Sequence, residues 1–280
     1  MLALASSNGY CEYNLFCRNK NIGVIMQIKV GTYNICHCAD FNEPIQDDGR
    51  SFVSPERTAK FLRNLNLDIV GLNEVFCSGP GEQYSKQTDK IARFLNYSYY
   101  AFAMGAKTDW GESIDAIGNS VISKYPIKSI ETEPVLSPAL NERKPEENDW
   151  YENRVILKCV FDVCGKEVVF ISTHFGLNKS ERLRMVKSLV EIIDKETRPI
   201  VLMGDFNTSP DSLDLIPIYE RLVNVAEIKG KKYEKTFESS NPTVTLDYIF
   251  VSKEINILDF NVVDKVLSDH LPITAILEIE

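Results

Sequence analysis

Short apolar runs separated by polar, turn-forming residues follow one another along the chain from residue 27 onward. Runs of this length, whether alternating or continuously apolar, predict strands. The predicted strands are residues 27–35, 68–75, 97–104, 119–123, 200–203, 246–252 and 271–279, with a hairpin of residues 154–163 and 166–173 that turns at Cys164-Gly165. Residues 200–203, IVLM, include no polar side chain, so this strand is expected to be buried on both faces.

Segments with helix signals lie between these strands. One helix is predicted to start at Pro55 with Ser54 as its N-cap, another to span residues 83–95, and a third to span residues 180–194 with Ser180 as its N-cap. Residues 110–118 and 137–153 are predicted to be loops. Strands outnumber helices and helices separate several strand pairs, so the pattern indicates an α/β fold of mixed sheets with helices outside.

The domain organisation follows from where this periodicity begins. No internal repeat and no Pro/Gly-rich linker divides the chain, which favours a single domain over residues 26–280. Residues 1–25 have no clear periodicity and no basic segment typical of a signal peptide. They are expected to form a poorly ordered N-terminal extension.

Composition, net charge and cysteine usage argue against several classes of function. Hydrophobic residues make up 44% and charged residues 25% of the 280, as in ordinary globular proteins. The net charge of -9 argues against tight nonspecific binding of nucleic acid, which needs a basic surface. No apolar run is long enough to span a membrane. Seven cysteines without a regular framework favour a reduced, cytoplasmic setting.

The tripeptide Cys36-His37-Cys38 has two alternative interpretations. Cysteine and histidine are zinc ligands, so the tripeptide could belong to a metal site. No second Cys/His pair stands at a suitable spacing, however, and the sequence favours an ordinary strand end over a zinc site.

The polar residues that carry chemistry fall at or near the ends of apolar runs. In layered α/β folds, strand ends hold binding and catalytic groups on a rigid scaffold. Taken singly, most have a structural alternative as turn residues, caps or hydrogen-bonded histidines, but a carboxylate in a buried strand needs a partner or a metal. The group comprises Asn34, Glu74, His174, Asp205, Asn207, Asp247, Asp269 and His270.

Asp205 and Asn207 follow the buried run of residues 200–203 directly. Strand alternation would place side chains two residues apart on the same side, so both are expected to point into one site. Together they could hold and orient a water or a metal-bound group. The alternative is a strand end followed by a turn, because Gly, Asp, Asn, Ser and Pro are turn formers.

Six short motifs, in this order, carry a family resemblance: TYNI, GLNEV, STHF, GDFN, LDYIF and SDH. From about residue 27 to the C-terminus the chain resembles the endonuclease/exonuclease/phosphatase superfamily, a group that includes pancreatic deoxyribonuclease. The resemblance implies a four-layer α/β sandwich, with two packed mixed β-sheets flanked by helices. It also implies hydrolysis of phosphate esters with a divalent metal, usually Mg²⁺, with Mn²⁺ as a substitute.

The resemblance assigns a metal site to three of these residues. Glu74 is implied as the main metal ligand, assisted by Asn34. Asp269 is implied to hold the same ion or a second one. Magnesium prefers oxygen ligands and keeps several waters, so a few carboxylate and amide groups suffice.

The remaining residues take catalytic roles by the same resemblance. Asp205 orients or deprotonates the attacking water, and Asn207 places that water or contacts phosphate. Asp247 pairs with His270, which then stabilises the charge that develops on the phosphorane. His174 is assigned as general acid.

Two further residues are candidates for binding the phosphate. Arg154 is a candidate clamp for a phosphate oxygen, and the alternative is an ordinary surface arginine at the start of a strand. Asn119 is a candidate for hydrogen bonding at the floor of the site.

The substrate is the least determined part of the prediction. Tyr248 stands where inositol-phosphate phosphatases of this superfamily typically have arginine, which argues against that branch. A small, soluble phosphodiester or phosphomonoester is expected. The alternatives are a DNA or RNA nuclease with the same site, which the net charge disfavours, and a non-catalytic binding module.

Overall fold

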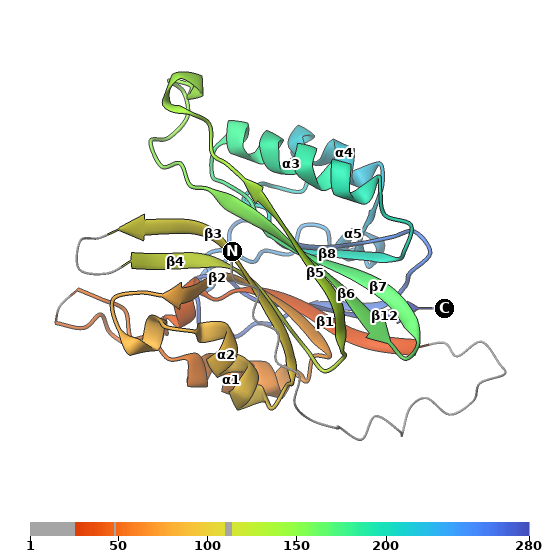
Figure 1. Ribbon diagram of the computed structural model, residues 1–280, viewed down its shortest axis with the longest axis horizontal. Coiled ribbons are helices and arrows are strands. Elements are labelled where there is room, and N and C mark those ends of the chain that lie inside the picture. The colour runs from red at the N-terminus through yellow and green to blue at the C-terminus, as the bar shows by residue number, and fades with distance from the viewer. Residues whose placement is uncertain (1–25, 48, 110–113, 280) are drawn as a thin grey trace.

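The computed structural model describes residues 26–47, 49–109 and 114–279 (Figure 1). The extension predicted at residues 1–25 lies outside the described residues. The strands are β1 (Met26–Asn34), β2 (Ile69–Ser78), β3 (Tyr99–Asp109), β4 (Ile114–Ser123), β5 (Ile127–Val135), β6 (Arg154–Val163), β7 (Lys166–His174), β8 (Ile200–Asp205), β9 (Val223–Asn224), β10 (Asp247–Val251), β11 (Asn256–Val262) and β12 (Ile273–Ile279).

The helices are fewer and most are short. They are α1 (Pro55–Leu65), α2 (Gln87–Leu95), α3 (Lys179–Ile193), α4 (Ile216–Tyr219) and α5 (Val225–Ile228), with 3-10 turns at Cys36–Cys38, Glu82–Tyr84, Leu140–Glu142 and Leu213–Leu215. Within the described ranges, no helix has the length and apolar character needed to cross a membrane.

The strands form two six-stranded sheets with matching internal layouts. Their orders are β11-β12-β1-β2-β4-β3 and β5-β6-β7-β8-β10-β9. Each sheet has one parallel pair near its centre, β1 with β2 and β7 with β8, and antiparallel pairs elsewhere. A parallel pair needs a crossover, and a helix supplies it in both cases: α1 between β1 and β2, and α3 between β7 and β8.

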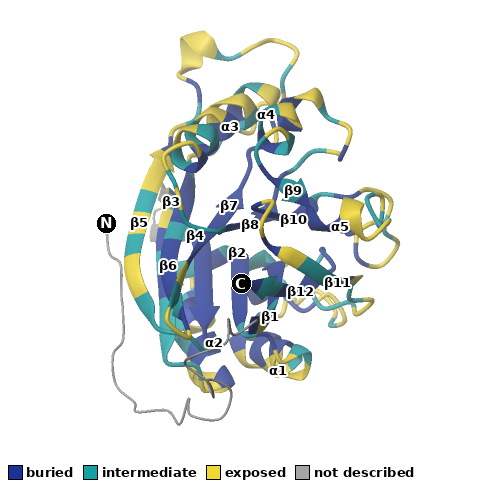
Figure 2. Ribbon diagram, turned by 90° about the vertical axis from the view of Figure 1, so that its right-hand side faces the viewer, coloured by how far each residue is buried: buried dark blue, intermediate teal, exposed yellow. Residues whose placement is uncertain are grey.

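The two sheets pack face to face between two layers of helices. In Figure 1, α1 and α2 lie on one side of the paired sheets and α3 and α4 on the other. Buried residues concentrate in the strands between these layers, while the outer sides of the helices are exposed (Figure 2). The predicted four-layer α/β sandwich of two mixed sheets is confirmed.

Three apolar clusters correspond to the three interfaces between the layers. The cluster between the sheets includes Ile28, Leu157 and Phe170, each fully buried. A second joins α3 and α4 to β7, β8 and β10, and a third joins α1 and α2 to β1, β2 and β4. Both faces of the central strands are therefore covered, which explains why residues 200–203 are continuously apolar.

Several predicted elements are observed close to their expected positions. Helix α1 starts at Pro55, and the Ser54 side chain accepts a hydrogen bond from the backbone N–H of Arg57, as an N-cap does. The hairpin of β6 and β7 turns at Cys164-Gly165, with Val163 paired to Lys166.

Three local predictions were wrong. Residues 114–118 belong to strand β4, not to a loop, because they pair with the end of β3. The predicted helix at residues 83–95 begins only at Gln87, after a separate 3-10 turn. The N-cap of α3 is Asn178 instead of Ser180, and the Glu181 carboxylate accepts a hydrogen bond from the Asn178 backbone N–H at 3.2 Å.

Candidate active site

The ends of the two parallel pairs bring the predicted site residues together. In β1 and β2, Asn34 pairs with Asn73. In the other sheet, Asp205 of β8 pairs with both His174 of β7 and Asp247 of β10, so these three residues stand side by side across three strands. The carboxyl ends of parallel strands meet at one edge of a sheet, and the two packed sheets place both edges at the same end of the molecule.

A break in β2 directs Glu74 into this site. The pairing of β2 with β4 shifts register between Leu72 and Val75, and Glu74 has a left-handed φ of 55°. Bulges of this kind re-aim a side chain at the cost of regular pairing. The Asn34 Nδ2 atom donates a hydrogen bond to Glu74 Oε1 at 2.9 Å and another to Asp205 Oδ2 at 3.2 Å, and thereby holds both carboxylates.

Asn34 therefore presents its amide nitrogen to the carboxylates. Its Oδ1 atom accepts a hydrogen bond from the backbone N–H of Cys36 at 3.1 Å. The residue predicted to assist in metal binding orients Glu74 and Asp205 in this structure, and its oxygen is engaged by the main chain.

Glu74 and Asp269 supply a donor set that fits a hard divalent cation. Burial raises the pKa of the Glu74 carboxyl; the Asn34 hydrogen bond opposes this rise and the nearby charge of Asp269 adds to it. Two neighbouring carboxylates repel each other, and a divalent cation would neutralise both. Mg²⁺ takes such oxygen ligands and completes its shell with water, so Glu74 and Asp269 would hold it, with Asn34 fixing the orientation of Glu74.

His270 lies between two buried carboxylates. Its Nδ1 atom is 2.9 Å from Asp247 Oδ2, as predicted for this pair, and its Nε2 atom is 3.5 Å from Asp205 Oδ2. Burial alone lowers the pKa of His270, but the charges of Asp247 and Asp205 outweigh it and raise the pKa to about 10. His270 is therefore an imidazolium at neutral pH, packed against the ring of Phe237 at 4.9 Å between centroids.

The buried group of Asp205, Asp247 and His270 could also hold a metal ion, because ligand atoms of all three lie within 4.8 Å of one another. The protonated imidazole argues against this at neutral pH. A metal would have to displace the proton on Nε2, because Nδ1 already donates to Asp247.

Asp205 is the most constrained residue of the site. Besides the Asn34 amide, its carboxylate accepts a hydrogen bond from the backbone N–H of Asn207 at 2.8 Å. Burial raises the pKa of Asp205 to about 7, with His270 opposing the rise and Asp247 adding to it. A carboxyl group with a pKa near neutrality is suited to general-base chemistry.

Asn207 reaches the site by a different route from the predicted strand alternation. β8 ends at Asp205, and Asn207 has a left-handed φ of 46° in a turn closed by its N–H bond to the Asp205 side chain. Its side-chain nitrogen lies 3.1 Å from His174 Nε2 and donates to the Phe175 carbonyl at 2.9 Å. Both residues face the site as expected, but an Asx turn positions Asn207.

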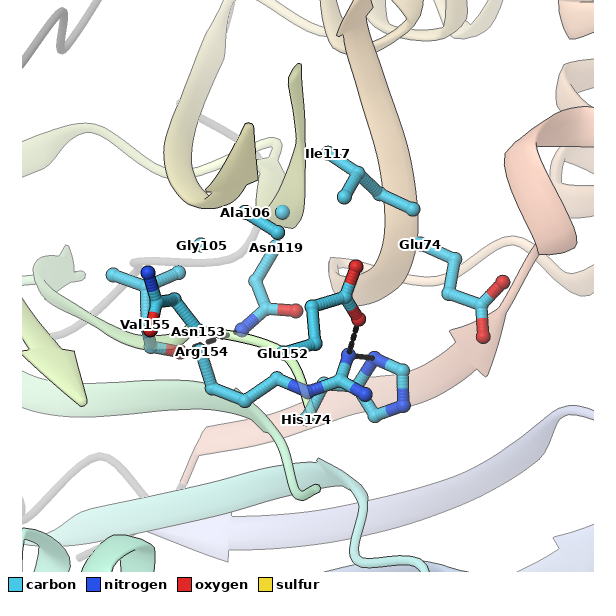
Figure 3. Close-up of a pocket in the computed structure, with 11 residues that line it drawn as sticks. Glu74, Gly105, Ala106, Ile117, Asn119, Glu152, Asn153, Arg154, Val155 and His174 are labelled. Atoms are coloured by element: carbon cyan, nitrogen blue, oxygen red, sulfur yellow. Dashed lines mark hydrogen bonds and ion pairs between the residues drawn. The ribbon is translucent and has the colours of Figure 1, made fainter. Parts of the chain in front are cut away.

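Arg154 and His174 line a small pocket, with Glu152 beside them (Figure 3). Arg154 Nη1 lies 3.0 Å from His174 Nδ1 and 3.0 Å from Glu152 Oε2. A guanidinium only donates, so Arg154 is the donor to His174 Nδ1, while His174 Nε2 lies 3.1 Å from the Asn207 amide nitrogen and 3.4 Å from Asp205 Oδ2.

His174 is neutral at physiological pH. Burial lowers its pKa well below the usual value, and the positive charges of Arg154 and His270 lower it further. Arg154 keeps a buried Nε atom for which the described residues provide no hydrogen-bond partner.

Asn119 contributes to the floor of the site through Asn73, a residue that the sequence did not single out. Asn73 Nδ2 donates to Asn119 Oδ1 at 2.8 Å and to the Thr173 carbonyl at 2.9 Å, and Asn73 Oδ1 accepts from the Asp205 backbone N–H at 3.0 Å. Asn119 in turn donates to the Val155 carbonyl at 2.8 Å. This chain of amides ties the two sheets together beneath Asp205.

The structure thus brings all the predicted site residues to one end of the sandwich, while their chemical roles stay predictions. Asn73 could have been noticed as an uncharged polar residue in a buried strand next to Glu74. Glu152 lies in a segment rich in Pro, Glu and Asn, and nothing in its surroundings marks it.

Comparison with known proteins agrees with this geometry. The model of the Endonuclease/Exonuclease/phosphatase family matches residues 31–270. An endonuclease/exonuclease/phosphatase from Beutenbergia cavernae is 23% identical with a TM-score of 0.66, covering 90% of this chain and 72% of its own. No curated protein matches the chain.

Two other similar structures bear names that specify an activity. The mannosyl-6-phosphatase of Bacteroides thetaiotaomicron is 18% identical with a TM-score of 0.63, over 89% of this chain and 99% of its own. ANGEL2, a 2′,3′-cyclic phosphatase in complex with adenosine-2′,3′-vanadate, is 15% identical with a TM-score of 0.61, over 91% of this chain and 96% of its own. At these identities the likeness shows the fold. With the family match covering most of its length, the chain belongs to the Endonuclease/Exonuclease/phosphatase family.

Proposed function

We propose that this protein is a phosphoric ester hydrolase, dependent on a divalent metal ion, in which an activated water attacks the phosphorus in line. The observation that carries the proposal is the placement of His270, with its pKa raised to about 10, between Asp247 and Asp205. Glu74 and Asp269 bring carboxylates to the same end of the fold. A fixed cation, a base that titrates near neutrality and ligands for a hard cation are what phosphoryl transfer needs.

The chain's own residues divide the reaction between them. Asp205 accepts a proton from the attacking water, which Asn207 orients, as the new P–O bond forms and the bond to the leaving oxygen breaks. His270 stabilises negative charge on the phosphoryl oxygens, and Arg154, which lines the pocket, binds one of them through its guanidinium group. An ion held by Glu74 and Asp269, which we propose to be Mg²⁺ or Mn²⁺, supplies further charge neutralisation.

His174 is proposed to position the phosphate. The sequence suggested a general acid, but a histidine whose pKa is lowered well below its usual value carries no extra proton to give near pH 7. The ring lines the pocket, where Arg154 fixes it through Nδ1 and the Asn207 amide lies 3.1 Å from Nε2.

The proposed substrate is a small phosphomonoester or phosphodiester. The net charge of -9 disfavours a polyanionic nucleic acid. Two similar structures are named as phosphatases, one for mannosyl-6-phosphate chemistry and one for 2′,3′-cyclic phosphates. A nuclease with the same site remains the alternative, and plasmid nicking distinguishes it.

Metal dependence tests the proposal. Aryl phosphomonoesters and phosphodiesters are incubated with the protein and Mg²⁺ or Mn²⁺, with and without EDTA. Glu74→Gln removes the ligand charge with little change of shape, and turnover is expected to fall by roughly 10²-fold or more. Glu167→Gln, an exposed residue of β7 paired with Lys128 and Arg198, is the matched control and should keep full activity.

Two results would contradict metal-dependent hydrolysis at this site. EDTA-insensitive hydrolysis, or equal turnover by Glu74→Gln and the control variant, would show that the reaction does not use a metal at this position.

A further inference from the structure

The turn that follows β1 has an unusual backbone. Cys36, His37 and Cys38 have φ angles of 40°, 48° and 65°, three consecutive left-handed residues of which none is glycine. L-residues with side chains rarely adopt this region, and such outliers cluster at ligand sites. In an extended strand the side chains of Cys36 and His37 would point to opposite faces, whereas this turn brings them to the same side.

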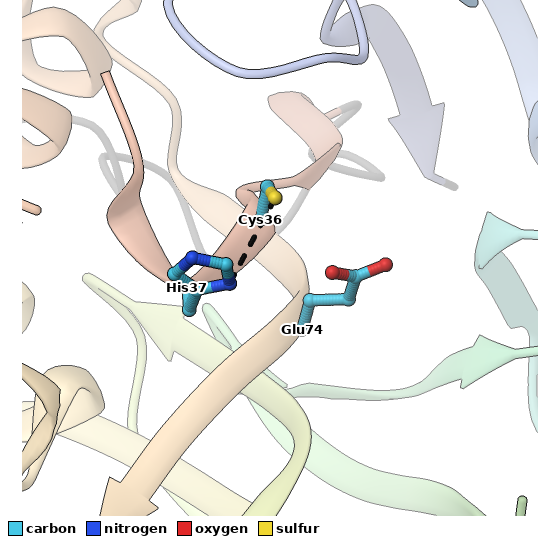
Figure 4. A group of neighbouring side chains, drawn as sticks. All are labelled: Cys36, His37 and Glu74. Carbon is cyan, nitrogen blue, oxygen red and sulfur yellow. Dashed lines mark hydrogen bonds between the residues drawn. The ribbon is translucent and has the colours of Figure 1, made fainter. Parts of the chain in front are cut away.

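Glu74 joins these two side chains from the neighbouring strand. Cys36 Sγ lies 3.8 Å from His37 Nδ1, and ligand atoms of Cys36, His37 and Glu74 all lie within 4.8 Å of one another (Figure 4). Tetrahedral zinc, with bonds of about 2.3 Å to sulfur and about 2.0–2.2 Å to nitrogen and oxygen, places its ligand atoms about 3.3–3.6 Å apart. A modest side-chain adjustment therefore closes the three around one ion.

The main chain around the turn is held in place. The Asn34 side chain accepts from the Cys36 N–H at 3.1 Å. The buried Gln87 side chain donates to the His37 carbonyl at 2.6 Å and accepts from the Phe76 N–H at 2.9 Å, which ties the turn to β2. Sites that hold their ligands through such supporting contacts are pre-organised for binding.

Neighbouring rings restrict the His37 imidazole, and the three candidate ligand side chains are accessible to an ion. The rings of Phe76 and Tyr84 lie 5.6 and 5.7 Å from the His37 ring, centroid to centroid, and restrict its orientation. Cys36, His37 and Glu74 are each only partly buried, so an ion and one water can reach the open coordination position.

We propose that Cys36, His37 and Glu74 form a site for Zn²⁺ or a similar borderline transition-metal ion, next to the phosphoesterase site and sharing Glu74 with it. Sulfur and imidazole ligands select such ions, whereas Mg²⁺ prefers oxygen alone. Binding forms a metal–sulfur bond and releases the Cys36 thiol proton to solvent. Zinc held here withdraws Glu74 from the hard-metal position and so inhibits hydrolysis, a consequence that rests on the proposed function.

Cobalt tests the binding site without any need for enzyme activity. Co²⁺ is added to the full-length protein under reducing conditions, and the thiolate-to-cobalt absorption band in the near ultraviolet is recorded. The wild type and Cys164→Ser, which alters a cysteine in the distant β6–β7 turn, should show the band. Cys36→Ser should lose it, and His37→Asn, chosen because asparagine tolerates a left-handed φ, should bind Co²⁺ at least about 10-fold more weakly.

Competition tests whether the two sites share Glu74. Excess Mg²⁺ should lower the apparent Co²⁺ affinity of the wild type, and Zn²⁺ should displace Co²⁺ and remove the band. Where phosphoesterase activity is measurable, micromolar-range Zn²⁺ should inhibit the wild type at least about 10-fold more strongly than Cys36→Ser. Circular dichroism confirms that the variants fold.

Three results would overturn the inference: no thiolate band in the folded wild type, the same band in Cys36→Ser, or equal zinc inhibition of both proteins. The cobalt spectrum stands even if no phosphate ester is hydrolysed, so failure of the proposed function and failure of the zinc site give different results.

Discussion

At the scale of single residues, the site depends on amides that hold carboxylates. Asn34 donates to Glu74 and Asp205 from one nitrogen, and Asn73 holds the backbone of Asp205. The residue types were visible in TYNI and GLNEV, but which atom of Asn34 faces the site depends on its bond to the Cys36 N–H. That bond forms only once the chain turns after β1, so the sequence could not supply it.

Replacing Asn34 should separate positioning from folding. In Asn34→Ala the two carboxylates lose their shared donor, so we expect metal affinity and turnover to fall by about 10- to 100-fold. Measuring the hydrolysis rate as a function of metal concentration gives both the metal affinity and the maximal turnover. Asn256→Ala, which removes an exposed amide on β11, is the control; if both variants behave like the wild type, Asn34 does not position the carboxylates.

The pH profile should report the Asp205–Asp247–His270 group. Activity requires Asp205 without its proton and His270 with its proton. kcat/KM should therefore rise with pH through an apparent pKa of about 7 and fall again near about 10. Asp247→Asn removes the negative charge nearest to the imidazole, so the His270 pKa falls and the descending limb moves to lower pH. A descending limb that stays in place in this variant would contradict the assignment.

At the scale of elements, the predictions located the buried central strands and missed several strands that lie at sheet edges. β1, β2 and β8 have continuous or alternating apolar residues because helices or the second sheet cover them. β5 is an edge strand whose residues are mostly exposed, and β11 contains a register shift between Ile257 and Asp259, so neither has the pattern of a buried strand and neither was predicted.

The close approach of β7 and β8 depends on Gly204, between Met203 and Asp205. Its φ is 147°, and an added Cβ would lie 1.8 Å from the Thr173 carbonyl oxygen. Gly204→Ala should therefore lower the free energy of unfolding by at least about 3 kcal/mol, through strain and displacement of the parallel pair.

A second glycine serves as the control for that effect. Gly230 has a φ of 72°, but an added Cβ would meet no atom within 4 Å. Gly230→Ala should lower the free energy of unfolding by only about 1–2 kcal/mol, the cost of the left-handed backbone alone. Denaturant unfolding of both variants measures the difference, and equal losses would show that the contact with Thr173 is unimportant.

At the scale of the whole molecule, the repeated layout of the two sheets explains how residues far apart in sequence meet. Each sheet has a parallel pair bridged by a helix, and polar residues stand where these pairs end. The family resemblance gave the layers and the residue set. It could not give the supporting contacts of Glu152, Gln87 and Asn73, which arise from packing between distant segments.

The central claim is that His270 acts as a fixed cation in the hydrolysis of phosphate esters. The most direct measurement is the rate at which His270→Ala hydrolyses a small aryl phosphate ester with Mg²⁺, next to the wild type and Lys265→Ala, an exposed residue of the same loop. We predict a loss of roughly 10²–10³-fold in kcat for His270→Ala and none for Lys265→Ala. Equal rates for all three folded proteins would contradict the account.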